Sequence, residues 1–281
     1  MIFWINRSKK EGVDSKMSKN PDIMIMPGIK REITDPFDTL DVMAVADLHI
    51  GDKNCDYNEV KAIINKIATT DNLYCVLAGD LMNTAIAGGR SDVYNEEVNV
   101  TEQLDKCVEL FKPIKSKILT IVPGNHEERI SRSVGFDMTA EFAKRLELQD
   151  IYSPTAALLF VKFGRATKTC APLTYSFYVT HGRGGGRKIG GKLNSLAEYA
   201  SIIDVDCYIV GHTHLPAAFK QSSYRVTPQR AQATLHEQLF VNTSAALNYG
   251  GYGMRSGYTP AAKSRPVITL DGTRQHLSVT L

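Results

Sequence analysis

Five short segments of this chain combine carboxylates, one amide and several imidazoles in a way that suits metal ions. In chain order they are Asp47-Leu48-His49, Gly79-Asp80, Gly124-Asn125-His126-Glu127, His181-Gly182 and Gly211-His212-Thr213-His214. They hold five of the seven histidines of the chain and no cysteine. Oxygen and imidazole ligands suit manganese, iron or zinc better than calcium or magnesium. The segments therefore predict a transition-metal site, and a carboxylate shared by two ions would make it dinuclear.

Such a pair of ions has a well-defined chemistry. Two metals about 3.5–4 Å apart can hold both the attacking and the leaving oxygen of an in-line displacement. Water bound to a metal ionises near neutral pH, which supplies hydroxide without a separate strong base. A departing alkoxide needs a proton, and an imidazolium can supply it near neutral pH. The residue set therefore suits metal-assisted hydrolysis in which an imidazole protonates the leaving oxygen.

Taken one at a time, these residues have simpler explanations. An aspartate after a strand is usually a turn residue or a helix cap, and a lone histidine is usually a satisfied polar residue. Asn125 beside Gly124 is typical of a turn. The pair His212 and His214 is moderately specific alone, because residues two apart in an extended segment point the same way. The repetition of this pattern after separate strands favours a functional site.

The elements that must position these residues are short apolar runs, each followed by one of the segments. Runs at 41–46, 73–78 and 118–122 predict buried strands, with helices expected at 58–69 and 97–114 between them. Strands that alternate with helices predict an α/β core. Ligands of such sheets bind beyond the carboxyl ends of the strands, where these polar segments fall.

The second half of the chain has a different pattern. A helix is expected at 136–148, followed by strands at 157–163, 173–180 and 207–210. Shorter strand-like pieces follow at 239–241, 266–270 and 276–281, with an Asp271-Gly272 turn between the last two. We therefore expect two β layers flanked by helices, with one active site at the strand ends.

Composition sets broad limits on the class of protein. The chain has 281 residues, of which 43% are hydrophobic and 22% charged, as in ordinary soluble globular proteins. A formal net charge of +3 neither requires nor excludes a polyanionic partner. The five cysteines are scattered without a CxxC pair, which indicates reduced thiols and a cytoplasmic location rather than a disulfide framework.

The N-terminal region differs from the rest of the chain. Residues 1–38 are expected to form a partly flexible appendage with one strand-like stretch at 23–26, and residues 39–281 to form the main domain. The apolar opening at 1–5 is too short for a signal peptide or a membrane span, so no membrane contact is expected.

The order D-x-H, G-D, G-N-H-E, H-G, G-H-x-H resembles the calcineurin-like metallophosphoesterase family. The resemblance implies a four-layer α/β/β/α sandwich with its active site at the carboxyl ends of the strands. It also implies two divalent transition-metal ions, with manganese as first choice and iron or zinc as alternatives. By this resemblance, Asp47, His49 and His214 would bind one ion, Asn125, His181 and His212 the other, and Asp80 would bridge them.

The resemblance also assigns the catalytic roles. A metal-bridging hydroxide would attack phosphorus, His126 would protonate the leaving oxygen, and Glu127 would orient His126. A catalytically silent binding module of this family would be expected to lose metal ligands. None is lost here, which favours an active phosphomonoesterase or phosphodiesterase.

Departures from the pattern narrow the substrate class. Phosphoprotein phosphatases of the family carry Asp-Arg-Gly after the second motif and Arg before Gly-Asn-His, whereas this chain has Leu81-Met82-Asn83 and Pro123. The run from Ala46 to Gly51 is similar to that of recombination-repair nucleases. Those usually have histidine at the position of Asn83 and carry a DNA-binding region after the core. A nucleotide or nucleic-acid phosphoester is therefore the expected substrate, with a DNA repair-type nuclease as the alternative.

A glycine-rich basic loop follows the ligand candidate His181. Its glycines permit close backbone approach, and Arg183 and Arg187 could contact substrate phosphates. A solvated connector is the competing interpretation. Arg129, just past the third motif, could reach the same substrate. The native substrate, the preference for monoesters or diesters, the metals and the oligomeric state stay open at this point.

Overall fold

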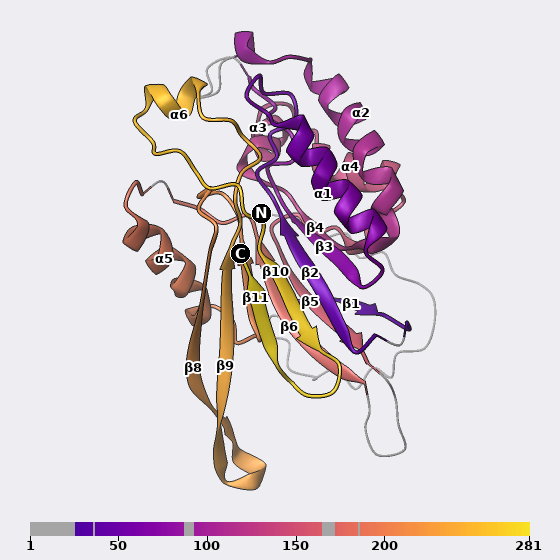
Figure 1. The fold of residues 1–281 in the computed structure, drawn as a ribbon, viewed down its shortest axis with the longest axis vertical. Helices are drawn as coiled ribbons and strands as arrows, with labels where there is room; N and C mark the ends of the chain where they lie inside the picture. The colour runs from indigo at the N-terminus through magenta and orange to yellow at the C-terminus, as the bar shows by residue number, and fades with distance from the viewer. Residues whose placement is uncertain (1–25, 36, 87–92, 165–171, 185) are drawn as a thin grey trace.

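The computed structural model describes residues 26–35, 37–86, 93–164, 172–184 and 186–281. Two mixed β-sheets pack face to face, and helices cover their outer faces (Figure 1). The strand order is β11-β10-β2-β3-β4 in one sheet and β1-β5-β6-β7-β9-β8 in the other. This arrangement confirms the predicted four-layer α/β/β/α sandwich. No helix in these described ranges is both long enough and apolar enough to cross a membrane.

The five-stranded sheet carries the first three ligand-bearing segments. Its strands are β2 (Thr39–Val45), β3 (Leu73–Ala78), β4 (Ile118–Val122), β10 (Val267–Asp271) and β11 (Leu277–Thr280). β2, β3 and β4 are parallel, so their carboxyl ends meet at one edge. Every residue of β3 and β4 is buried, which explains why both read as continuous apolar runs.

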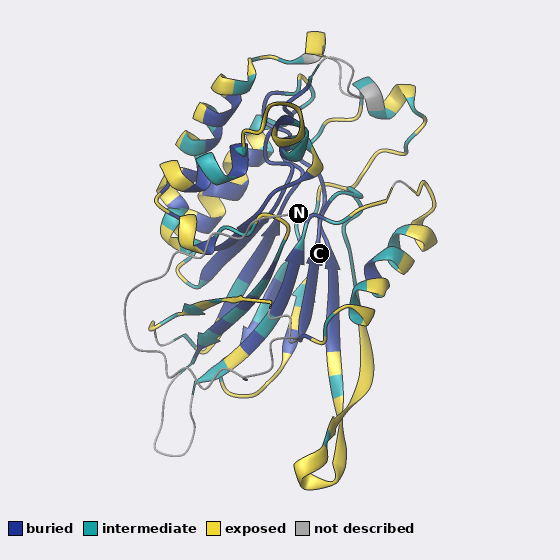
Figure 2. Ribbon diagram, turned by 180° about the vertical axis from the view of Figure 1, so that it is seen from behind, coloured by how far each residue is buried: buried dark blue, intermediate teal, exposed yellow. Residues whose placement is uncertain are grey.

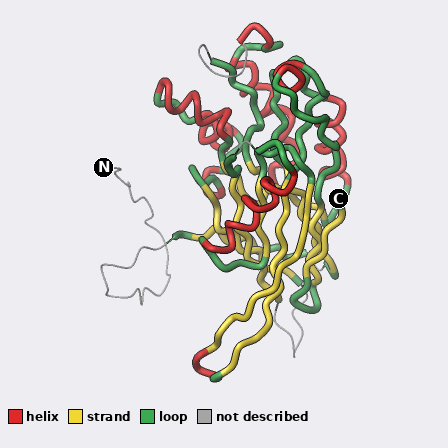
Figure 3. The backbone as a smooth tube through the Cα atoms, turned by 90° about the vertical axis from the view of Figure 1, so that its left-hand side faces the viewer, coloured by secondary structure: helices red, strands yellow, loops and turns green. Residues whose placement is uncertain are grey.

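The six-stranded sheet carries the remaining segments. Its strands are β1 (Gly28–Glu32), β5 (Ala156–Phe163), β6 (Leu173–Thr180), β7 (Cys207–Val210), β8 (Ala217–Thr227) and β9 (Gln232–Asn242). β6, β7 and β9 are parallel. The far ends of β8 and β9 are exposed, unlike the buried strands beside them (Figure 2). They form a hairpin that projects beyond the rest of the molecule (Figure 3).

The helices form the outer layers. They are α1 (Tyr57–Thr69), α2 (Val100–Phe111), α3 (Asn125–Val134), α4 (Met138–Arg145), α5 (Ile189–Ala197) and α6 (Gly251–Arg255). Short 3₁₀ turns lie at Val93–Asn95, Lys112–Lys117, Gln149–Ile151, Glu198–Ser201 and Pro228–Arg230. Apolar residues of α1 to α4 pack on the five-stranded sheet, whereas Leu196 of α5 packs on the six-stranded sheet. A third apolar cluster fills the space between the sheets.

Most expected elements are present, and the differences have local causes. The helix expected at 97–114 ends earlier, at Phe111, and continues as a 3₁₀ turn that contains Pro113, which has no N–H to donate. The helix expected at 136–148 spans Met138–Arg145. β1, β8, α3, α5 and α6 were not expected.

The N-terminal region contributes a strand to the main body. Within the expected appendage, β1 pairs in parallel with β5, from Gly28 opposite Leu158 to Glu32 opposite Lys162. Residues 23–25 of the strand-like stretch lie outside the described residues. The domain boundary after residue 38 stays a prediction, although residues 28–32 belong to the sheet.

Candidate metal centre

The five predicted segments meet where the carboxyl ends of the parallel strands of the two sheets lie side by side. The backbone N–H of His212, just past β7, donates to both carboxylate oxygens of Asp47, just past β2, at 3.2 and 3.0 Å. The Nδ1 atom of His181, just past β6, lies 2.8 Å from the carbonyl oxygen of Ala78 at the end of β3. Residues separated by more than a hundred positions are therefore brought into one cluster.

Three groups of side chains in this cluster could each hold a metal ion. They are Asp47, His49 and His214; His49, Asp80 and His126; and Asp80, His181 and His212. In each group one ligand atom from every residue lies within 4.8 Å of the others. Asp80 and His49 each belong to two groups. A carboxylate shared in this way is what a bridging ligand requires.

Direct distances within the cluster are short. The Asp80 Oδ2 atom lies 3.1 Å from His181 Nε2, and Asp47 Oδ1 lies 3.3 Å from His214 Nε2. The amide oxygen of Asn125 lies 3.1 Å from His181 Nε2 and 2.7 Å from His212 Nδ1. All seven residues predicted to bind metal are therefore together, with Asn125 exposed and both aspartates fully buried.

Several contacts show that the cluster suits a cation. The Nε2 atoms of His49 and His214 lie 3.2 Å apart, and His212 Nδ1 lies 3.3 Å from His181 Nε2. The buried His49 Nδ1 has no hydrogen-bond partner among the described residues. A cation accepts lone pairs from neighbouring imidazoles at once, and carboxylates supply the compensating charge. The donor set therefore fits divalent metal ions.

The backbone around the ligands is strained. Eight non-glycine residues of the described ranges have positive φ, and six of these lie in the cluster. They are Asp47, His49, Asp80, Thr84, His212 and His214, with φ between 45° and 68°. Left-handed non-glycine residues cost roughly 1–3 kcal/mol each and gather at functional sites. Their concentration here indicates that the fold holds these side chains in place at the expense of local stability.

Electrostatics keep the carboxylates ionised. Burial alone would raise the pKa of Asp47, but the charge and hydrogen bond of His214 lower it to about 2. Burial alone would lower the pKa of His181, but the charge and hydrogen bond of Asp80 raise it to about 10. Without metal, a proton on His181 therefore balances Asp80. A divalent cation could displace that proton.

A model of the calcineurin-like phosphoesterase family matches residues 40–216, which contain all seven residues. The chain belongs to this family. The members of this family are classed as phosphoester hydrolases. The cluster of aspartates and histidines supports the binding of divalent metal ions. No curated protein matches the chain.

Solved structures show similar folds at low identity. Vacuolar Protein Sorting 29 of Cryptosporidium parvum is 16% identical, with 86% of this chain and 97% of that chain covered and a TM-score of 0.39. A predicted phosphoesterase of Streptococcus pneumoniae is 13% identical, with 86% and 88% covered and a TM-score of 0.36. GAP50, an anchor in the inner membrane complex of Plasmodium, is 11% identical, with 83% and 81% covered and a TM-score of 0.43. The family assignment therefore rests on the sequence match.

Neighbouring groups hold the candidate metal ligands and His126 in place. The Nδ1 atom of His126 lies 2.7 Å from the carbonyl oxygen of Asn83, and the Thr84 hydroxyl donates to the His126 carbonyl oxygen. The Thr243 hydroxyl donates to Asp47 Oδ2 at 3.1 Å, and Lys192 Nζ donates to the Thr213 carbonyl oxygen at 2.7 Å.

The sequence alone did not identify the supporting role of four of these residues, Asn83, Thr84, Thr243 and Lys192. Thr243 follows a strand end, as the motif residues do, and this position was the available signal. The carbonyl of Asn83, the hydroxyl of Thr84 and the ammonium of Lys192 leave no such signal in the sequence. Their contacts depend on how distant elements pack.

Glu127 acts differently from the sequence expectation. Its buried carboxylate accepts hydrogen bonds from the backbone N–H groups of Asp80, Met82 and Gly124, at 3.1, 2.9 and 2.9 Å. The His126 ring is instead held by Asn83. Burial and the charge of Asp80 raise the pKa of Glu127 to about 7. Glu127 therefore fixes the turns that carry Asp80 and Asn125, and it reaches His126 only through the backbone.

The three candidate arginines are placed differently. Arg129 is half-buried on α3, where burial lowers its pKa and the charge of Asp80 opposes that change. Burial raises the pKa of Tyr199, and the nearby charge of Arg183 opposes that rise. The guanidinium carbon of Arg187 lies 5.7 Å from the ring centre of Tyr258. Arg129 is thus close to the cluster, whereas Arg183 and Arg187 are exposed and face Tyr199 and Tyr258.

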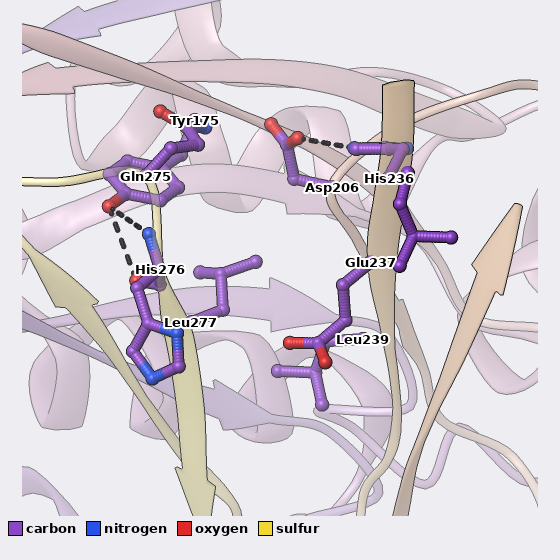
Figure 4. A pocket seen from close by; sticks show the side chains of 9 residues that line it. Tyr175, Asp206, His236, Glu237, Leu239, Gln275, His276 and Leu277 are labelled. Carbon is purple, nitrogen blue, oxygen red and sulfur yellow. Dashed lines mark hydrogen bonds and ion pairs between the residues drawn. The ribbon is translucent and has the colours of Figure 1, made fainter. Parts of the chain in front are cut away.

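The two remaining histidines of the chain lie elsewhere. His236 and His276 line a cavity of about 260 Å³ together with Tyr175 and Asp206 (Figure 4). Tyr175 lies near the start of β6 and Asp206 just before β7, so the cavity is at the opposite end of these strands from the metal cluster. His236 Nε2 lies 2.9 Å from Asp206 Oδ1.

Proposed function

We propose that this phosphoesterase hydrolyses a phosphoester of a nucleotide or nucleic acid with two divalent transition-metal ions. The observation that carries the proposal is the gathering of all seven predicted ligands in one cluster, in which Asp80 belongs to two of the three ligand groups. Asp47, His49 and His214 would hold one ion, and Asn125, His181 and His212 the other. Manganese is the first choice, with iron and zinc as alternatives.

The ions would supply the electrophilic chemistry, since bound metals activate water for attack and draw charge from phosphoryl oxygens. The protein would supply the proton for the leaving group through His126. Because a carbonyl oxygen only accepts, the contact with Asn83 places a proton on His126 Nδ1. A second proton, on Nε2, would make the ring an imidazolium; burial lowers the pKa of His126, and the charge of Asp80 opposes that change. As the phosphorus–oxygen bond breaks, Nε2 would pass that proton to the departing oxygen and leave a neutral ring.

Basic side chains would receive the anionic substrate. Arg129 would contact the phosphoryl group beside Asp80, whereas Arg183 and Arg187 would meet phosphates farther from the reacting bond. The effect of the Asp80 charge on the pKa of Arg129 and the position of Arg187 beside Tyr258 support this assignment. Arginine suits this task because its planar guanidinium can make two parallel hydrogen bonds to phosphate. Arginines at different distances from the reacting bond favour a substrate with several phosphates, such as a nucleotide or a nucleic acid, over a simple monoester. The four cysteines in the described part of the chain are buried and unpaired, which supports a reducing, cytoplasmic setting.

The test is a substrate panel on metal-depleted protein with manganese, iron or zinc added back. Initial rates are measured on nitrophenyl monoesters and diesters, nucleotides and oligonucleotides, and bound ions are counted by elemental analysis. We expect two ions per chain and hydrolysis that chelation removes and manganese restores. Preferential cleavage of oligonucleotides would favour the nuclease alternative. Full metal occupancy with no turnover of any substrate would indicate a binding module.

A further inference from the structure

Arg265, just before β10, lies in the interior behind the ligand Asp47. Its side chain is only 6% exposed. One terminal nitrogen, Nη1, donates to the carbonyl oxygen of Ala46 at 3.1 Å and also to the carbonyl oxygen of Ser244. The other, Nη2, donates to Glu59 Oε1 of α1 at 3.2 Å. The guanidinium therefore joins three separate segments of the chain.

Two of these segments fix the position of Asp47: one contains it, and the other hydrogen-bonds to it. Ala46 directly precedes Asp47 at the end of β2. Ser244 directly follows Thr243, whose hydroxyl donates to Asp47 Oδ2 at 3.1 Å. In the same segment, the backbone N–H of Ala246 donates to the Asp47 carbonyl oxygen at 2.9 Å. Arg265 thus fixes the distance between Asp47 and the segment that hydrogen-bonds to it.

The backbone conformation of Asp47 explains why its surroundings must hold it in place. Asp47 has φ of 55°, which an aspartate adopts only when its surroundings hold it there. A buried arginine is costly to desolvate, and a hydrophobic side chain of similar volume is often at least as stabilising. The guanidinium presents its donors to the two carbonyl oxygens and the carboxylate in a rigid planar fork, whereas the ammonium of lysine is a compact charge on a flexible stem. The cost is therefore best explained by the geometry that Arg265 imposes.

We propose that Arg265 is a positioning residue for the metal ion held by Asp47, His49 and His214. It acts by anchoring the carbonyls of Ala46 and Ser244, so that the Asp47 carboxylate stays aimed at that ion. The inference rests on the proposed function in one respect, the binding of two ions. It adds that the two metal sites depend unequally on the segment that precedes β10.

Lys263 offers a matched control in the same segment. Its ammonium lies 2.5 Å from Asp56 Oδ2 and 3.7 Å from Glu59 Oε2, the carboxylate that Arg265 also meets. It also donates to Asn248 Oδ1 at 2.7 Å. Lys263→Met therefore removes a cation that shares Glu59 with Arg265 but leaves the carbonyls of Ala46 and Ser244 bound.

The experiment compares the full chain with Arg265→Met, Arg265→Lys and Lys263→Met. Manganese is titrated into each metal-depleted protein, bound ions are counted, and electron paramagnetic resonance distinguishes coupled ion pairs from isolated ions. We expect two ions and a coupled spectrum for wild type and Lys263→Met. For Arg265→Met we expect one binding step weakened by about 10–100-fold and an isolated-ion spectrum at limiting manganese. Arg265→Lys, which keeps the charge, should lie between them.

The outcomes separate the two proposals. Circular dichroism of the metal-depleted proteins checks that each variant is folded, and Arg265→Lys decides the matter if Arg265→Met does not fold. Two ions bound with wild-type affinity in the folded Arg265 variants overturn the positioning role alone. An equal loss in Lys263→Met also overturns it, because any damage to the segment would then suffice. A wild-type chain that binds none of manganese, iron and zinc overturns the proposed function and this inference with it.

Discussion

Histidine side chains contact aspartate side chains at both ends of the six-stranded sheet, but the two sets of contacts differ in their hydrogen bonding and backbone strain. At the far end, His236 lies between two carboxylates, 2.9 Å from Asp206 and 3.4 Å from Asp204. Asp206 also accepts hydrogen bonds from the backbone N–H and the hydroxyl of Ser176. Here nitrogen and hydroxyl donors face carboxylate oxygens, although the buried His236 Nδ1, like His49 Nδ1, has no hydrogen-bond partner among the described residues.

At the metal cluster, like groups face each other instead. Imidazole nitrogens of His49 and His214 lie 3.2 Å apart, and the nearby Asp47 and Asp80 are both buried with left-handed backbones. None of the described non-glycine residues with positive φ lines the far cavity. The metal cluster is therefore marked by imidazole nitrogens that face each other and by left-handed backbone at its ligands, which protein atoms alone leave uncompensated. The proximity of histidine to aspartate is not sufficient.

Substitution of the carboxylates should affect the two ends of the sheet most differently. Asp80→Asn keeps the shape of the side chain but removes the charge shared by two ligand groups. Residues that merely support a metal ligand typically contribute about 10–100-fold to metal affinity or activity, so loss of Asp80 should exceed that range. Asp206→Asn should leave kcat/KM and metal content unchanged. Steady-state kinetics and elemental analysis check both, and comparable losses in the two variants would contradict the distinction.

The histidines give the next largest contrast. His126→Ala should keep both ions but lower kcat by about 10²–10⁴-fold for substrates with poor leaving groups, because the departing oxygen loses its proton donor. Nitrophenyl esters should lose less, since nitrophenolate departs without a proton. His236→Ala should change neither rate. Equal losses for good and poor leaving groups, or release of metal, would remove His126 from this role.

The arginines should show a smaller contrast. Arg129→Gln should lower kcat/KM by about 10–100-fold, the scale of one charge-assisted hydrogen bond of about 1.5–3 kcal/mol. Arg183→Ala and Arg187→Ala should act more weakly and mainly through KM, because these side chains lie near Tyr199 and Tyr258. Arg225, which pairs with Asp204 at 2.7 Å, provides the control. A loss in Arg225→Gln as large as in Arg129→Gln would indicate a general effect of charge.

The smallest expected effect is on the stability of the far network. Asp206→Ala leaves the donors of Ser176 and His236 without their acceptor, so the free energy of unfolding should fall by about 1–3 kcal/mol. Urea unfolding of the metal-depleted protein measures this change. Activity per folded molecule should stay at the wild-type value. A fall in metal content would show that the two ends of the sheet are coupled.

The ligand cluster was predictable because its signals are local. Asp47, Asp80 and His181 each end a buried apolar run, and β3 and β6 have the predicted bounds. β8 was not predictable in this way, because most of its eleven residues are exposed and its strand character comes from pairing with β9. The sequence pattern did not predict α5, because its first turn contains Gly190 and Gly191 and glycine is a poor helix former.

Contacts between distant segments were beyond the reach of sequence patterns. Glu127 follows His126 directly, yet its carboxylate turns away to backbone amides of another strand end. Arg265 reaches Ala46 across more than two hundred residues of chain. Such contacts follow from how the two sheets pack, and no spacing of residue types encodes them.

The placement of β1 has a practical consequence for handling the protein. β1 covers the edge of β5, and Gly28 is closely packed there, since a side chain would collide with the ring of Phe160. A chain shortened to begin at residue 39 would leave the backbone groups of that edge unpaired. Uncovered edges recruit strands from other molecules. Truncation at the apparent start of the family domain should therefore yield turbidity and self-association on concentration, even though every catalytic candidate is retained.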